Sequence, residues 1–263
     1  MLRAFRSELT KLRSFRVLAG GAAMIAATAA LSYFALNEAT SNPSSALARA
    51  LPTQQGLIIL LSSHAQTLLI AIAIIVVAAN VAAEWSQGTL RNLLVREPGR
   101  LRLLAGKMLA LLLFVTISAA LALLIGAGVA LAAAQSHGIS TTLWTSSDGM
   151  SAFFSFFGNV LLGLVGVSLL GMLIAVLTRS TGAAIGISLA YALVGEGLVD
   201  AVWPDGGQWF PVHLFGYLPG VTSPMSYGAP PMGYSSDLIV ALVWMAGFIV
   251  VSGVLFRFRD VSA

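Results

Sequence analysis

Six long apolar stretches, separated by short polar segments, dominate the hydrophobic pattern of this chain. Each stretch is long enough to cross the roughly 30 Å hydrocarbon core of a bilayer at 1.5 Å per residue. A short polar turn separates the fourth stretch from the fifth, which predicts two antiparallel neighbours. The predicted spans cover residues 17–36, 57–83, 103–134, 152–178, 182–203 and 236–256. The pattern therefore predicts an all-α membrane protein with six transmembrane helices.

Composition supports a membrane environment. The chain is 58% hydrophobic and 9% charged, whereas about a quarter of the residues in soluble domains are charged. It contains no cysteine, which excludes disulfides and thiolate metal sites. The net charge of +4 is modest, so we expect the lipid bilayer, and no nucleic acid, as a partner.

Lysine and arginine lie almost entirely on one side of the six predicted spans. Only Arg49, one of the fourteen cations, falls in a segment on the other side. Cytoplasmic segments of membrane proteins carry an excess of these residues. The distribution predicts a multi-pass protein of the cell's inner or plasma membrane, with both termini in the cytoplasm.

The first sixteen residues form a basic, amphipathic pattern with apolar positions at helical spacing. This pattern predicts an interfacial helix over residues 1–16, followed by one transmembrane domain over residues 17–263. A disordered basic tail is the alternative. A cleavable signal peptide is a further alternative, but the long charged segment and an apolar stretch reaching Leu36 favour an anchoring helix. The apolar positions of the interfacial helix are Leu2, Phe5, Leu9 and Leu12.

The polar segment Glu84–Lys107, here called the basic loop, separates the second and third predicted spans and holds five cations. Thr89 can cap a short helix, and Pro98 with Gly99 would end it. Leucines give this helix an apolar face, which favours docking of a cytoplasmic partner over a loop that only fixes topology. The predicted contact residues are Thr89, Leu90, Arg91, Leu93, Leu94 and Arg96.

Polar residues also occur within the apolar stretches. In the second span they fall within a sector of about 100° on one helical face, and they predict either hydrogen bonds to another helix or the lining of a pathway. Glu196 lies in the fifth span between two glycines, and an acid there is a functional candidate unless it sits at the wet outer end. The candidate pathway-lining residues are Ser63, Gln66, Asn80 and Glu196, with Glu84 completing the stripe.

Two further features concern the outer side and helix packing. Residues 204–235 hold six of the nine prolines together with several aromatic side chains, which predicts short re-entrant segments at the outer interface. Gly182 and Gly186 open the fifth span at a spacing that permits close helix approach, for example between two protomers.

No catalytic, cofactor or metal site is predicted. Ser168 lies in a Gly-Val-Ser sequence that resembles an intramembrane serine protease, but the three histidines all fall in predicted outer segments, away from it. Lys107 follows a glycine, yet the spacing of a phosphate loop and its following Ser or Thr are absent. We therefore expect this chain not to be an enzyme.

The motifs together resemble the membrane subunits of ATP-binding-cassette exporters of the type-2 permease family. The likeness rests on the start of the chain at residues 7–14, on the acidic-aromatic, Gly-Thr-Leu-Arg pattern of residues 84–91, and on residues 98–107. The resemblance implies an N-terminal elbow helix, a coupling helix over residues 86–97, and outer re-entrant segments before the last span.

The same resemblance implies the function. Such permeases pair with a second copy or a homologue, and separate cytoplasmic ATPase subunits bind ATP and magnesium, so no cofactor is expected in this chain. Their substrates are amphiphilic drugs, peptides or lipid-like molecules. Two alternatives stay open: a membrane-embedded assembly or binding protein without a transport cycle, and a proton-coupled secondary transporter that uses Glu196.

Overall fold

The computed structural model describes residues 5, 7, 10, 11, 15–63, 65–89, 99–203, 206–218 and 232–258. These residues form helices joined by short turns, and no strand occurs among them. The helices are α2 (Phe15–Ser41), α3 (Ala46–Ala50), α4 (Gly56–Ser63), α5 (Ala65–Ser86), α7 (Arg100–Ser136), α8 (Ser147–Thr178), α9 (Thr181–Ala190), the π-turn η1 (Tyr191–Gly195), α10 (Glu196–Val202), the 3-10 turn η2 (Gly207–Trp209), α11 (Pro211–Tyr217) and α12 (Tyr234–Phe258).

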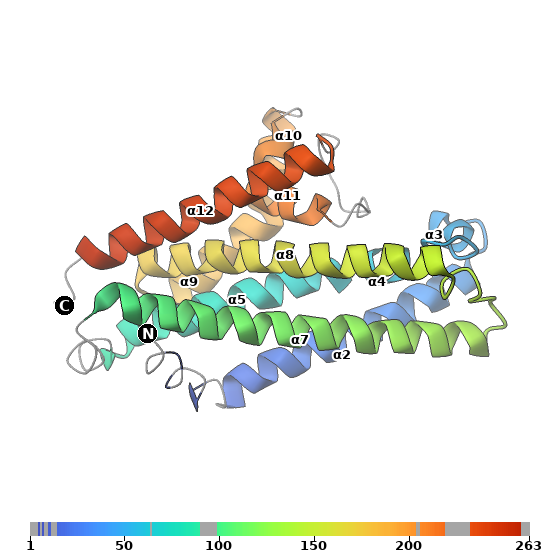
Figure 1. Ribbon diagram of the computed structural model, residues 1–263, viewed down its shortest axis with the longest axis horizontal. Helices are drawn as coiled ribbons and strands as arrows, with labels where there is room; N and C mark the ends of the chain where they lie inside the picture. The colour runs from blue at the N-terminus through green and yellow to red at the C-terminus, as the bar shows by residue number, and fades with distance from the viewer. Residues whose placement is uncertain are drawn as a thin grey trace.

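Six helices in the described part of the chain are long and apolar enough to cross a membrane. This result confirms the all-α, six-span prediction, and the chain has the architecture of a multi-pass membrane protein. Helices α7 and α8 run along the long axis of the molecule (Figure 1). The spans are Val17–Ser41, Gln66–Ser86, Arg100–Ser136, Ser147–Thr178, Thr181–Val199 and Tyr234–Phe258.

Helix α8 forms the centre of the bundle. In its most apolar stretch 72% of the residues are buried, against 17% for the fifth span and 22% for the last. Glycines on α8 permit this position: a Cβ at Gly163 would lie 2.7 Å from the carbonyl oxygen of Phe215, and one at Gly171 would lie 2.9 Å from the side chain of Ile74. Both α5 and α11 therefore pack closely against α8.

One end of the molecule, here called the basic end, collects the ends of five spans. The hydroxyl of Ser86, at the end of α5, accepts hydrogen bonds from the backbone N–H and the hydroxyl of Thr181, both at 3.0 Å. Arg100, the first residue of α7, donates to the carbonyl oxygen of Arg257 near the end of α12 at 3.2 Å. Among the described cations, Arg49 alone belongs to the opposite end, where α3 lies (Figure 1).

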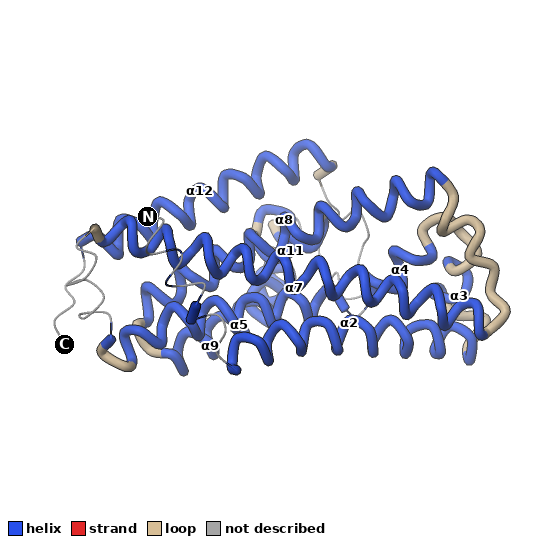
Figure 2. The backbone as a smooth tube through the Cα atoms, turned by 60° about the horizontal axis from the view of Figure 1, so that its bottom comes forward, coloured by secondary structure: helices blue, strands red, loops and turns tan. Residues whose placement is uncertain are grey.

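At the opposite end, Trp144 links the turn between α7 and α8 to the end of α3. Its indole N–H donates to the carbonyl oxygen of Leu51 at 2.8 Å, and its side chain is fully buried. The tube representation shows the turns of this end gathered beyond the ends of α7 and α8 (Figure 2).

The fifth span differs from the continuous helix predicted for residues 182–203. It is interrupted by η1, whose wider turn lies directly before Glu196.

The described part of the region 204–235 contains the 3-10 turn η2 and the short helix α11. Helix α11 begins with a proline at its first position, where no backbone N–H is needed, and it contacts both α8 and α12. In Figure 1, α11 lies near the middle of the length of α8 rather than beyond its end. Helix α11 therefore packs beside α8 and α12.

Candidate functional site

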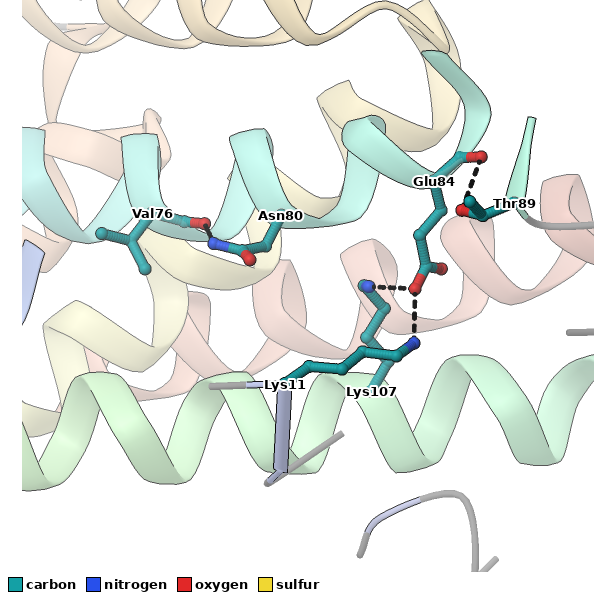
Figure 3. Close-up of polar contacts among 6 residues, drawn as sticks. All are labelled: Lys11, Val76, Asn80, Glu84, Thr89 and Lys107. Atoms are coloured by element: carbon teal, nitrogen blue, oxygen red, sulfur yellow. Dashed lines mark hydrogen bonds and ion pairs between the residues drawn. The ribbon is translucent and has the colours of Figure 1, made fainter. Parts of the chain in front are cut away.

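A buried carboxylate marks the start of the basic loop. The Oε1 atom of Glu84, in the last turn of α5, lies 2.7 Å from Nζ of Lys107 on α7 and 3.1 Å from Nζ of Lys11 in the N-terminal segment. Figure 3 shows the two ammonium groups converging on this oxygen. Three segments that are distant in the sequence thus meet at one atom.

Glu84 and Lys107 are largely buried, so their pairing contributes to the stability of the fold. The side chains of Glu84 and Lys107 are 11% and 8% exposed, whereas that of Lys11 is 45% exposed. A charge removed from water is costly unless a partner compensates for it. We therefore regard Glu84 and Lys107 as a structural ion pair, to which the N-terminal segment adds a second, more solvated cation.

Further contacts hold the ends of the basic loop. The hydroxyl of Thr89 donates to the carbonyl oxygen of Glu84 at 3.4 Å. The ring of Trp85 meets that of Phe256 on α12 edge to face, with centroids 5.5 Å apart. The described ends of the basic loop therefore continue into α5 and α7, and these helices contact α9 and α12.

Only one of the predicted partner-contacting residues lies within the described part of the chain. Thr89 is exposed. Leu90, Arg91, Leu93, Leu94 and Arg96 lie outside the described residues, as do most of residues 1–14 and of the predicted helix 86–97. Of the predicted interfacial helix, Phe5 packs against the hydrophobic core, and Lys11 contacts Glu84.

The predicted polar stripe does not form a single site. Gln66 is buried and donates through Nε2 to the carbonyl oxygen of Gly216 on α11 at 3.0 Å. Asn80 turns its amide toward its own helix and donates to Val76 at 2.7 Å (Figure 3). Ser63 is the last residue of α4. Gln66 and Asn80 therefore make two separate contacts, while Glu84 belongs to the ion pair.

Glu196 stabilises the start of α11. Its carboxylate accepts the backbone N–H groups of Val212 at 2.8 Å and His213 at 2.6 Å, which are the second and third helical positions. The residue preceding the helix, Phe210, offers no capping side chain. Glu196 is 2% exposed, so it is buried rather than placed in an aqueous outer layer.

The environment of Glu196 is that of a helix-capping group. The first N–H groups of a helix lack partners within it, and a carboxylate there also interacts favourably with the helix dipole. The side chain of Tyr191, from the π-turn η1, also interacts with this carboxylate. Glu196 thus connects the fifth span to α11.

Neither the pairing of Glu84 with Lys107 nor the capping role of Glu196 was predicted from the sequence. A usable signal for the first was an acid at the end of one span with a lysine in the first turns of the next. A signal for the second was a proline-started helix without a capping residue of its own. Within the described segments, no group of three or more His, Asp or Glu side chains is placed to hold a metal ion.

The fold and these contacts define a polytopic helical membrane protein whose spans are connected by ion pairs and backbone hydrogen bonds. The chain belongs to the family described as protein of unknown function (DUF2705), whose model matches residues 23–262. A comparison with curated proteins gives no match.

Proposed function

We propose that this chain is the permease subunit of an ATP-binding-cassette exporter and that it moves an amphiphilic substrate. In this proposal a second copy or a homologue completes the translocation pathway, and a separate cytoplasmic ATPase subunit drives it. The motif likeness of residues 84–91 and 98–107 and the six-span architecture support the proposal. The chain itself carries out no ATP hydrolysis.

The observation that carries the proposal is the buried contact of Glu84 with Lys107 and Lys11. It connects α5, α7 and the N-terminal segment at the base of the basic loop. A force applied to the loop by a docked ATPase would reach these three segments together, because they are joined by charge-assisted contacts rather than by flexible linkers. Such a connection suits a loop that transmits motion from outside the membrane.

The test is a double substitution in the basic loop, Arg91→Glu with Leu93→Asp. The permease is produced in its native host, so that its own partner proteins are present. We expect the double variant to lose co-purification of the ATPase and ATP-driven transport in vesicles, while its melting temperature stays that of the wild-type chain. Full transport by this variant would refute the proposed coupling role.

A matched control uses the same chemical changes at the opposite end of the molecule. Arg49 lies in α3, and Leu143 is 46% exposed. Arg49→Glu with Leu143→Asp should leave the ATPase bound and active. If the wild-type chain co-purifies with membrane proteins but with no ATPase, the alternative of an assembly or binding protein gains support instead.

The proton-coupled alternative receives less support from the environment of Glu196. Both of its carboxylate oxygens accept backbone N–H groups at short distances. A group that carries protons must be released from such bonds in each cycle, and two such bonds to the start of α11 would have to break each time. We therefore assign Glu196 to the outer architecture of the permease.

A further inference from the structure

An open, apolar groove lies between α7 and α12 at the basic end. It has a volume of about 350 Å³, within the range of about 300 to 1,000 Å³ that small-ligand sites occupy. Its lining includes Met108, Met172, Val250, Gly253, Arg257 and Phe258. Among these, Val250 and Phe258 are 61% and 74% exposed, so the groove opens on the outer surface of the bundle.

The groove is apolar along its length and basic at one end. Residues 249–257 of α12 extend roughly 12 Å at 1.5 Å per residue, which is close to the roughly 15 Å thickness of one hydrocarbon leaflet. Methionines from α7 and α8 offer flexible, adaptable walls. These dimensions suit a single acyl chain lying along the helix.

The basic end of the groove carries the charge that a lipid headgroup would meet. Arg257 lines the groove, is exposed, and lies with its guanidinium 5.4 Å from the centre of the Phe258 ring. Arg100 donates to the carbonyl oxygen of Arg257, which brings a second guanidinium to the same place. No acidic side chain is found among the described residues that line the groove.

We propose that this groove binds an anionic phospholipid, with one acyl chain between α7 and α12 and the headgroup phosphate beside Arg257 and Arg100. Basic sites between transmembrane helices near the cytoplasmic surface attract acidic headgroups. The charge complementarity selects an anionic over a zwitterionic lipid, and the apolar lining excludes a free phosphate as the preferred ligand. This site is independent of the ATPase coupling proposed above.

The test uses the purified full-length chain and native mass spectrometry with an equimolar mixture of phosphatidylglycerol and phosphatidylcholine. The wild-type chain should retain phosphatidylglycerol in preference. Arg257→Gln should reduce this preference by about fivefold, the effect expected for one cation near a membrane surface. An unchanged preference in this variant would overturn the assignment of the headgroup site.

Gly253→Leu tests the acyl-chain site. A Cβ at Gly253 would lie 3.7 Å from Leu101, an ordinary contact, so a leucine should extend into the groove and displace the lipid without disturbing the backbone. Gly247→Leu is the matched control on the same helix, because no atom lies within 4 Å of a Cβ there, and it should retain the lipid.

If Gly253→Leu does not yield folded protein, Val250→Trp fills the groove from an exposed position instead. Loss of the bound lipid in either groove variant, with retention in Gly247→Leu, supports the proposal. Equal lipid retention by the wild-type chain and a folded groove variant overturns it. Binding of inorganic phosphate with the affinity of the lipid would also overturn it, since the acyl chain would then contribute nothing.

Discussion

The ammonium group of Lys107 and the carboxylate of Glu84 lie 2.7 Å apart and join the third turn of α7 to the last turn of α5. Both side chains are largely withdrawn from solvent, whereas Lys11, the second partner of Glu84, remains half exposed. The two lysines therefore contact the same oxygen atom from very different environments.

Lys107→Met should destabilise the protein more than Lys11→Met. Removing one partner of a buried ion pair costs about 3 to 5 kcal/mol, and we expect a value toward the lower limit because Lys11 remains beside Glu84. Loss of an exposed cation costs about 1 kcal/mol or less. Unfolding in mixed micelles with increasing denaturing detergent measures both changes, and equal effects would contradict the unequal roles assigned to the two lysines.

Glu196→Gln should weaken the attachment of α11. A glutamine offers a single acceptor oxygen, so one of the two N–H groups at the start of the helix loses its partner, at a cost of about 1 to 3 kcal/mol for a buried donor left unsatisfied. Limited proteolysis of the outer region should become faster. Glu38→Gln, at an exposed acid near the end of α2, is the control and should leave the proteolysis rate unchanged.

The same Glu196→Gln variant distinguishes the capping role from proton transport. If Glu196 carried protons, the substitution would abolish pH-driven uptake in vesicles that lack ATP. A variant with faster proteolysis but with unchanged transport at every pH agrees with a cap.

Gly163→Ala should disturb the contact between α8 and α11. The added methyl group would lie 2.7 Å from a backbone oxygen of Phe215, so one of the two helices must move, at about 1 to 3 kcal/mol. Gly158→Ala, on the same helix with open space around its Cβ, should be neutral or stabilising by up to about 1 kcal/mol. Melting temperatures of the two variants check this difference, and a neutral Gly163→Ala would refute the close packing.

The membrane orientation can be measured directly because the chain contains no cysteine. Gln87→Cys introduces a thiol at the basic end, and Ser140→Cys introduces one in the exposed turn between α7 and α8. With an impermeant maleimide added to intact cells, we expect labelling of the second variant alone. Labelling of Gln87→Cys under these conditions would reverse the predicted topology.

The number and the approximate limits of the spans followed from the sequence, because hydrophobic length is a local property of the chain. The π-turn before Glu196 did not follow from it. This turn depends on how the helix fits its neighbours, because the residues there are compatible with a continuous helix.

The contacts of the polar residues were less predictable than the spans. Helical periodicity placed Gln66, Asn80 and Glu84 on one face, and that geometry was compatible with one shared pathway. In the structure their partners lie on α11, on α5 itself and on α7. The periodicity of one helix carries no information about which neighbours face each turn, so the sequence could indicate polar contacts but not their distribution.

The π-turn Tyr191–Gly195 sets the angular position, around the helix axis, of the residues that follow it in the fifth span. A π-turn accommodates about one more residue than an α-helical turn, and one residue corresponds to about 100° around a helix. Without that extra residue the carboxylate of Glu196 would be turned by about a quarter of a revolution, away from the N–H groups of α11. A one-residue deletion in this turn would therefore remove the cap of α11, as a substitution of Glu196 would, although every acidic residue is still present. The number of residues at this point thus determines the attachment of α11 as much as their identity does.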